Sequence, residues 1–220
     1  MILPDWLRPL LPPDTAGTWE AIADAVPPGA YLGGGTALAV HLRHRLSRDL
    51  DFFLPAPVEL GTLADALGAR GPLRITTFDD TPGRQTLNAV FSATKLQFLE
   101  ASTLAMVEPT IRVAGVDVAG LGDLLAMKLK VLGDRNELRD YFDLKVIDET
   151  TGRRVEEGIA LFVEKYAPRG PDQAVSAILR ALAYLDDVEA DPLVPEGVGD
   201  IEKYWRRRVP EITRNLSRYG

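Results

Sequence analysis

Cysteine is absent from this chain of 220 residues, so neither disulfides nor thiolate metal ligands are available. This composition suits a reducing compartment, and we expect a cytoplasmic protein. Histidine is almost as scarce: His41 and His44 are the only two, and no third candidate ligand follows at a spacing typical of zinc sites. No serine lies in a Gly-x-Ser-x-Gly context, which disfavours a hydrolase triad.

Long apolar runs and repeats are also missing, and we expect no targeting signal. The N-terminus, MILPDWLRPLLPPD, is interrupted by prolines and acids and has no basic lead-in, unlike a signal peptide. No apolar stretch approaches the roughly 20 residues of a membrane-spanning helix. We therefore expect no membrane partner.

Basic residues are fewer than acidic ones, with 25 Lys and Arg against 32 Asp and Glu, so the formal net charge is -7. This argues against nucleic-acid binding driven by the charge of the whole protein. Basic residues nevertheless gather at two places, which can still hold a nucleotide or RNA locally. They are Arg43, His44, Arg45 and Arg48, and, towards the C-terminus, Lys203, Arg206, Arg207, Arg208, Arg214 and Arg218. We interpret the C-terminal group as a solvated helix face.

The pattern of apolar residues predicts an α+β fold. Residues 1–120 mix helical spacing with strand-like alternation, interrupted by turn-forming residues. From Leu121 onward every segment has helical spacing. We therefore predict a mixed β-sheet with helices over residues 1–120, followed by a helical domain over residues 121–220. The expected helices are 18–25, 37–42, 60–67, 121–132, 137–148, 155–166, 171–187 and 200–218, and the expected strands are 49–54, 73–78, 86–92, 95–99 and 111–118, the last folded at Gly115.

The segment YLGGGTALAVHLRHRLSRDLDFF (residues 31–53) shows the clearest signs of chemistry. Asp49 and Asp51 alternate with apolar residues, so on a strand their carboxylates share one face. Adjacent carboxylates repel each other unless a cation lies between them, and a divalent metal is the usual partner. The alternative is a pair of ordinary acids that form salt bridges with Arg45 or Arg48.

Three glycines precede the helix-like part of this segment. Glycines let backbone N–H groups approach an anion, and a helix N-terminus attracts phosphate. Thr36 is a candidate N-cap of that helix. Ser47 is a candidate phosphate contact or a modification site that blocks such contact; the alternative is a simple turn serine. The glycines themselves have an alternative too, as a tight connection that needs positive φ.

Four segments occur in order along the chain: Gly34–Leu38 (GGTAL), Arg45–Phe52 (RLSRDLDF), Ala126–Leu129 (AMKL) followed by Arg135, and Arg139–Leu144 (RDYFDL). They resemble the motifs of the AbiEii-type nucleotidyltransferases, the toxins of abortive-infection and type IV-like toxin–antitoxin systems. The resemblance implies a DNA polymerase β-like nucleotidyltransferase core. It also implies an enzyme that transfers a nucleoside monophosphate from an NTP and releases pyrophosphate.

The resemblance assigns roles to the first two of these motifs. Gly34, Gly35 and Thr36 would hold the nucleotide phosphates, with Ser47 as a further contact. Asp49 and Asp51 would bind Mg²⁺, which bridges the phosphates and orients the attacking hydroxyl.

The two later motifs would supply the rest of the site. Lys128 would neutralise triphosphate charge, and Arg135 would be a further nucleotide contact. Asp140 would either organise Lys128 or act as a base near the acceptor. The alternatives are a lysine that extends to solvent from an apolar helix, and a plain surface pair of Arg139 with Asp143.

The sequence departs from the superfamily pattern at one position. Many members of the superfamily carry a third metal-binding carboxylate on a later strand. The corresponding strand here is residues 94–100, with Gln97 at the place of that carboxylate and Glu100 on the opposite face. Either two acids suffice, Asp140 supplies a third, or catalysis is impaired.

We therefore expect a Mg²⁺-dependent nucleotidyltransferase that modifies an RNA, for example the acceptor end of tRNA, and that an antitoxin neutralises. The helical domain is expected to complete the active-site cleft. One alternative is a nucleotide-binding regulatory protein with weak or no transferase activity. Another is transfer to a hydroxyl of a protein or a small molecule.

Overall fold

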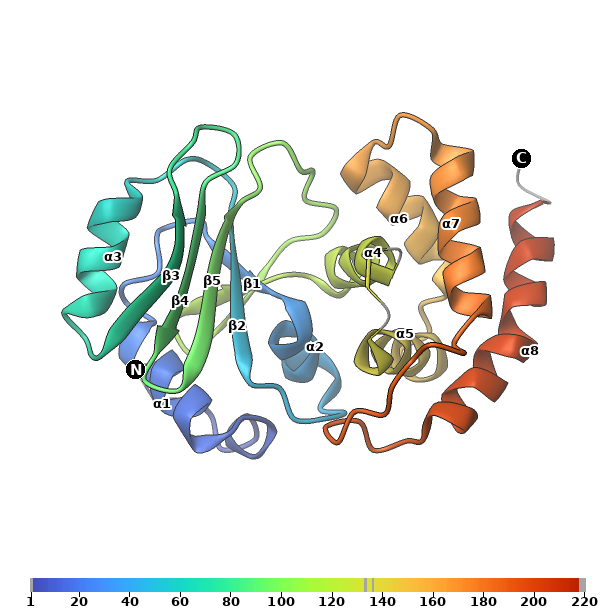
Figure 1. The fold of residues 1–220 in the computed structure, drawn as a ribbon, viewed down its shortest axis with the longest axis horizontal. Coiled ribbons are helices and arrows are strands. Elements are labelled where there is room, and N and C mark those ends of the chain that lie inside the picture. The colour runs from blue at the N-terminus through green and yellow to red at the C-terminus, as the bar shows by residue number, and fades with distance from the viewer. Residues whose placement is uncertain (1, 133, 136, 218–220) are drawn as a thin grey trace. The chain divides into compact units, whose positions relative to one another are not determined.

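The computed structural model describes residues 2–132, 134–135 and 137–217, which form two compact units. The first unit runs up to Leu104 and includes Glu108–Gly120; the second consists of Ala105–Val107 and the chain from Leu121 onward. Strands occur in the first unit and long helices dominate the second (Figure 1). The α+β class predicted from the sequence is confirmed.

The first unit is built on a mixed sheet that has seven strands within the described residues, in the order β3-β4-β5-β2-β1-β7-β6 (Figure 1). The strands are β1 (Tyr31–Gly33), β2 (Asp49–Leu54), β3 (Leu73–Asp79), β4 (Thr86–Phe91), β5 (Thr94–Glu100), β6 (Ile111–Val113) and β7 (Val116–Val118). The helices of this unit are the 3-10 helix η1 (Arg8–Leu10), α1 (Pro13–Ile22), α2 (Gly34–Leu42) and α3 (Leu60–Gly68).

The two faces of the sheet differ along β2 because its residues alternate between buried and half-buried positions. The buried face forms the core, where Phe52 stacks on Phe98 of the parallel neighbour β5 at 4.8 Å between ring centroids. Helix α1 contacts β2 and β5, and its Thr18 hydroxyl is hydrogen-bonded to the hydroxyl of Thr94 on that face. The other face is half-open and carries Asp49 and Asp51.

Two local expectations need correction. The first helix begins at Pro13 rather than Thr18, because proline is tolerated in the first turn of a helix, where its missing N–H costs no hydrogen bond. Tyr31–Gly33 is a short strand, held between β2 and β7, which was not among the expected elements. The expected fold of residues 111–118 at Gly115 is confirmed, since they form the antiparallel strands β6 and β7 around Ala114 and Gly115, both of which have positive φ.

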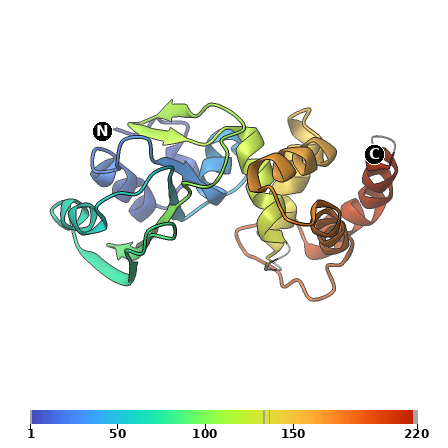
Figure 2. The same cartoon turned by 90° about the horizontal axis from the view of Figure 1, so that it is seen from above.

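The second unit is a bundle of helices (Figures 1 and 2). They are α4 (Leu121–Leu132), α5 (Leu138–Thr150), α6 (Val155–Tyr166), α7 (Pro171–Ala183) and α8 (Val198–Leu216). Helix α4 is the inner helix, since it packs against α5, α6 and α7, and α8 closes the bundle against the same three. Residue 218, expected in the last helix, lies outside the described residues. No helix of the described part is both long and apolar enough to cross a bilayer.

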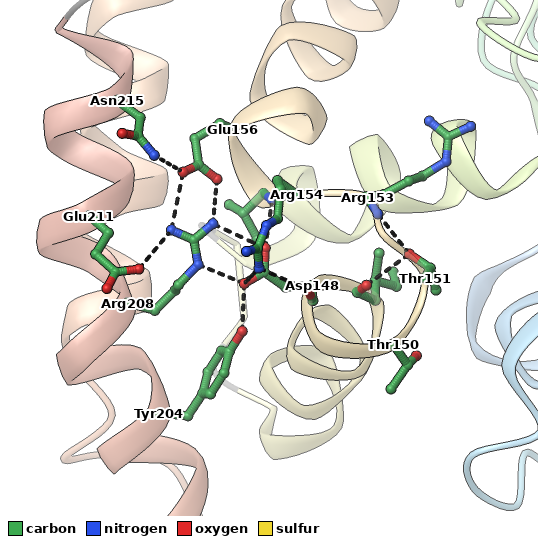
Figure 3. A network of polar contacts seen from close by, with 12 residues as sticks. Asp148, Thr150, Thr151, Arg153, Arg154, Glu156, Tyr204, Arg208, Glu211 and Asn215 are labelled. Carbon is green, nitrogen blue, oxygen red and sulfur yellow. Dashed lines mark hydrogen bonds and ion pairs between the residues drawn. The ribbon is translucent and has the colours of Figure 1, made fainter.

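Arg208 on α8 forms ion pairs with acids of α5 and α6 (Figure 3). Its buried guanidinium donates to Asp148 at 2.7 Å and to Glu156 at 2.6 Å, and the Tyr204 hydroxyl donates to the same Asp148 carboxylate. The interpretation of the C-terminal basic group as a solvated face is therefore wrong at Arg208. It holds for the described remainder of the group, whose side chains are exposed: Lys203, Arg206, Arg207 and Arg214.

A second buried ion pair fixes the segment Ala105–Val107 to the helical unit. Lys165 donates to Asp123 at 2.7 Å, and both side chains are fully buried. The same ammonium donates to the Ala105 carbonyl at 2.7 Å, and the Val107 N–H donates to Asp123 at 3.2 Å. A buried charge is tolerated only when it is paired and hydrogen-bonded, as this pair is.

Candidate functional site

Asp49 and Asp51 lie on the same half-exposed face of β2, as the alternation predicts. The Asp49 carboxylate has neither a hydrogen bond nor an ion pair with any residue that the structure describes. For Asp49, the alternative of a salt bridge with Arg45 or Arg48 is therefore wrong. A half-exposed carboxylate without an internal partner is available to an external cation.

Gly34 lies directly against the second carboxylate. Its φ is +65°, and a Cβ at this position would lie 2.3 Å from Asp51 Oδ2. The preceding Gly33 pairs with Asp51 in the antiparallel β1–β2 register. Glycine is needed at position 34 for two reasons, the left-handed backbone and the close approach of the carboxylate. The Asp51 side chain is thereby fixed beside the start of α2.

Gly35 likewise lies close to a charged side chain, here the guanidinium of Arg45. A Cβ there would lie 2.8 Å from Arg45 Nη2 and 3.1 Å from Ser47 Oγ. Arg45 is buried, and its Nη1 donates to the Leu46 carbonyl at 2.9 Å. A guanidinium beside the first turn of α2 adds its charge to the positive end of the helix dipole. This corner of the unit combines a fixed cation with helix N–H groups, which suits an anion.

Thr36 is not the N-cap of α2, because the helix begins at Gly34 with Gly33 as its cap residue. The Thr36 hydroxyl lies 2.5 Å from the Asp49 carbonyl oxygen and 2.8 Å from Ser47 Oγ. Since a carbonyl only accepts, Thr36 donates to Asp49 and Ser47 donates to Thr36. Both side chains are buried. Their hydroxyls therefore hold β2 in place, and neither has a proton left for a phosphate in this arrangement.

A row of polar side chains continues across the sheet from Asp51. Asp51 pairs with Gln97 in the β2–β5 register, and Gln97 pairs with Asn88 in the β5–β4 register. Gln97 Nε2 donates to Asn88 Oδ1 at 2.9 Å. Gln97 thus lies beside Asp51, as predicted, whereas Glu100 pairs with Leu54 on the other face. The described residues hold no group of three or more His, Cys, Asp or Glu that could bind a metal ion.

In the helical unit, Lys128 is buried between two acids. Its Nζ lies 2.6 Å from Asp140 Oδ1 and 2.7 Å from Asp143 Oδ2, and only 6% of its side chain is exposed. Arg135 Nε donates to Asp140 Oδ2 at 2.9 Å. The alternative of a lysine extended to solvent is therefore wrong. So is the surface pair of Arg139 with Asp143, because Arg139 donates to Glu137 instead.

The environment of Asp140 favours one of its two expected roles. Burial raises the pKa of this carboxyl, but the charges and hydrogen bonds of Lys128 and Arg135 outweigh burial and hold the pKa below its ordinary value. Asp140 therefore stays ionised at neutral pH and is a weak base. The geometry favours a positioning role, in which Asp140 fixes Lys128.

The site residues fall into two sets. The glycine turn, Ser47, Asp49 and Asp51 belong to the first unit, and Lys128, Arg135 and Asp140 belong to the second. His41 takes part in neither set, since its Nε2 is hydrogen-bonded to the Ala119 carbonyl at 2.8 Å.

Comparison with known proteins identifies the family. The family described as "Nucleotidyl transferase AbiEii toxin, Type IV TA system" matches residues 20–218. The chain belongs to the AbiEii nucleotidyltransferase family. The resemblance seen in the motifs is thereby confirmed, and so is the expectation of a nucleotidyltransferase. Membership implies an NTP substrate, typically a divalent metal, and an antitoxin partner.

Individual relatives agree with the family in sequence and fold. An uncharacterized protein of Aquifex aeolicus (strain VF5) is 27% identical over 192 residues, which cover 86% of this chain and 87% of that protein. A crystal structure of a candidate nucleotidyltransferase from H. pylori has a TM-score of 0.55 at 20% identity, and covers 92% of this chain and 93% of its own. The crystal structure of JHP933 from Helicobacter pylori has a TM-score of 0.54 at 20% identity, with 99% and 96% covered. At this identity, the two structures show the shared fold.

Asn88 and the positioning role of Thr36 were not predicted. The pairing of Asn88 with Gln97 could have been predicted from the sequence. The turn Ser92–Ala93 brings Phe91 opposite Thr94, and this register pairs Asn88 with Gln97. The contact of Thr36 with Asp49 depends on how α2 packs on β2, which no local pattern contains.

Proposed function

We propose that this protein transfers a nucleoside monophosphate from an NTP to a hydroxyl of an RNA, with the acceptor end of tRNA as the preferred candidate. Mg²⁺ is the proposed metal, and an antitoxin is the proposed inhibitor. The observation that carries the proposal is the pair Asp49 and Asp51, fixed on one sheet face beside the glycine turn in a member of the AbiEii family.

The residues of this face fit a hard divalent cation. Asp49 has no internal partner among the described residues, and the Asp51 carboxylate lies beside the N-terminus of α2. Mg²⁺ binds to one or two carboxylates together with substrate phosphate oxygens and water, which matches this donor set. Asp49 and Asp51 would hold the ion, which would neutralise charge on the phosphates and the attacking oxygen.

The other residues of the first unit would bind and align the nucleotide. The N–H groups at Gly34 and Gly35 and the Arg45 guanidinium would attract the phosphates. Thr36 and Ser47 would keep β2 in register with the glycine turn.

The helical unit would supply a cation. Lys128, held by Asp140 and Asp143, would neutralise charge on the triphosphate, and Arg135 would contribute a second positive charge. That these residues complete the active site stays a prediction.

The proposed reaction is a displacement at the α-phosphorus. The acceptor hydroxyl oxygen forms a bond to this phosphorus, and the bond from the phosphorus to the oxygen bridging to the β-phosphate breaks. Pyrophosphate leaves with the electron pair, and the hydroxyl proton passes to solvent. Proximity and charge neutralisation provide most of the acceleration in such a step.

The experiment is a transfer assay with the purified protein, Mg²⁺, each labelled NTP in turn, and total tRNA or total protein as the acceptor. The proposal expects label on tRNA and none when EDTA is present. Label on protein alone would show that the acceptor is a protein and not an RNA.

A nucleotide-binding regulatory protein is the second candidate, and Gln97 is the observation that favours it, because a neutral amide lies beside Asp51 where the superfamily often has a carboxylate. Binding of NTP without transfer to any acceptor would decide for this candidate.

A further inference from the structure

Strand β3 is an open edge of the sheet. It comes first in the strand order, and among the described residues β4 is the one strand that pairs with it (Figure 1). The residues between its two ends are all exposed. They include Ile75 and Phe78, whose exposed fractions of 43% and 48% are high for large apolar side chains. An edge with apolar side chains and unpaired backbone groups is a place where another strand can join a sheet.

A bulge shapes this edge. The register with β4 shifts between Ile75 and Thr77, so Thr76 is an extra residue of β3. The Thr76 hydroxyl donates to the Asn88 carbonyl at 3.1 Å, which holds the bulge against β4. The bulge is therefore a fixed feature of the strand, and it decides which side chains share a face.

The pairing with β4 shows how the side chains divide. Ile75 and Phe78 pair with two buried residues of β4 that are two positions apart, so both lie on the face of the core. Arg74, Thr77 and Asp79 pair with half-buried residues of β4 and lie on the other face. Without the extra residue, each of these two sets would be split between the faces.

The resulting pattern is symmetric about Thr77 once the bulge residue is left out. The first neighbours of Thr77 are Ile75 and Phe78 on one face, and the next are Arg74 and Asp79 on the other. An antiparallel copy of β3 that has Thr77 opposite itself therefore places apolar opposite apolar and cation opposite anion. Such cross-strand pairs are the contacts that stabilise a sheet.

Both charges are available to a second strand. Arg74 is exposed and has no hydrogen bond or ion pair within the part of the chain that the structure describes. Asp79 accepts bonds from the N–H and the hydroxyl of Thr81, both through Oδ1. Its Oδ2 is 3.5 Å from Nε of Arg84, an arginine that is 72% exposed. Since each carboxylate oxygen has two acceptor sites, Oδ2 has capacity for a further guanidinium.

We propose that β3 pairs with the β3 of a second copy of this chain, antiparallel and about a two-fold axis at Thr77. Each copy offers both Arg74 and Asp79, so the symmetric interface contains two ion pairs. A strand with charges of one sign only would meet repulsion at one of these positions, whereas a second copy matches both. Rotation about an axis perpendicular to the sheet keeps the same face upward, so the acid pairs of both copies open on one side of a continuous sheet.

The first test is sedimentation velocity of the full chain from about 1 μM to about 1 mM. One strand pair buries less than the about 1,200 Å² of a stable complex, so we expect a reversible dimer whose fraction rises with concentration. Protein that stays monomeric over this range would overturn the inference and leave the edge to a strand of a different protein.

Charge variants test the register of the pairing. Arg74→Glu places two carboxylates opposite each other at both pairs, and Asp79→Lys places two cations there. Each variant alone should dimerise at least about tenfold more weakly than the unmodified protein. Arg169→Glu, an exposed arginine of the helical unit, is the control and should dimerise normally. Circular dichroism shows whether each variant is folded.

An equimolar mixture of the folded Arg74→Glu and Asp79→Lys proteins should associate about as tightly as the unmodified protein, because each mixed dimer again has two pairs of opposite charge. Mixing does not restore the lost contacts of Asp79 with Thr81, so recovery identifies the charge pairing itself. Variants that dimerise normally alone, or a mixture that stays monomeric, would overturn the inference.

A cross-link tests the axis. Directly opposite residues of antiparallel strands have Cα atoms roughly 4.5–5.5 Å apart, a distance that a disulfide spans. The chain has no cysteine, so a disulfide of Thr77→Cys joins two copies at this position. In a glutathione buffer it should form at least about tenfold faster than for Thr62→Cys, an exposed position on α3. Equal rates would place the two-fold axis elsewhere and contradict the proposed pairing.

Discussion

Gly34 combines a backbone requirement and a functional contact in one residue. Its φ is +65°, and the place that a Cβ would take lies only 2.3 Å from Asp51 Oδ2, which leaves no room for a side chain. The close contact fixes the carboxylate of Asp51, a proposed metal ligand. The proposed chemistry therefore depends on two carboxylates and on the backbone that holds them.

Gly34→Ala tests this contact. We expect the variant to lose more than about 1 kcal/mol of stability, because alanine is strained at φ +65°. Transfer should fall by about a hundredfold, since Asp51 must move to admit the methyl group. Gly61→Ala on α3 is the control, because a Cβ there meets no atom within 4 Å and φ is not positive. Chemical unfolding and the transfer assay measure both effects; equal activity of the two variants would refute the assigned role of Gly34.

Asp140 gives a prediction about pH. Its pKa is held below the ordinary 3.8, so its ionised form stabilises the fold above about pH 4, and this stabilisation is lost as the pH falls through the folded-state pKa. Asp140→Asn should therefore show a smaller loss of unfolding free energy between pH 7 and pH 3 than the unmodified protein. Urea unfolding at several pH values measures this. The same loss in both proteins would show that Asp140 does not contribute.

Among the strands and helices, alternation along β2 placed both acids on one face, but it did not reveal what lies beside them. The parallel pairing of β2 with β5 joins segments about 45 residues apart in the chain, which no local pattern specifies. The assignment of Thr36 as an N-cap was wrong for a related reason: the helix starts three residues earlier than expected, and Thr36 bonds to the strand that follows. Local sequence predicts the elements, and long-range packing determines their contacts.

Helix α8 depends on Arg208. Arg208→Ala would leave Asp148 and Glu156 without their main cation, and loss of one partner of a buried ion pair costs about 3–5 kcal/mol. Arg214→Ala, on the exposed side of α8, should change stability by less than about 0.5 kcal/mol. Hydrogen exchange should show faster exchange in α8 of the first variant only. Unchanged protection in α8 would show that apolar packing alone holds the helix.

For the molecule as a whole, the α+β class and the family could be predicted from the sequence, because both rest on patterns within short segments. The assignment of Ala105–Val107 to the helical unit could not be predicted from the sequence. It depends on the buried pair of Lys165 with Asp123, and Lys165 lies far along the chain from that segment and looks like ordinary charge in the sequence. From the family motifs we expected Asp140 either to organise Lys128 or to act as a base. The contact of Lys128 with a second acid, Asp143, was not expected and comes from the helix packing.

Asp49→Ala gives the sharpest test of the proposed metal site and of the transfer reaction that depends on it. The measurement is transfer of labelled nucleotide to tRNA in the presence of Mg²⁺, with Asp65→Ala, an exposed acid on α3, as the matched control. We expect the Asp49 variant to fold normally and to lose transfer by at least about a hundredfold, because it removes a proposed metal ligand. Growth inhibition should disappear with it, while the control keeps both. A folded Asp49→Ala protein with the transfer rate of the unmodified protein would contradict the proposed site.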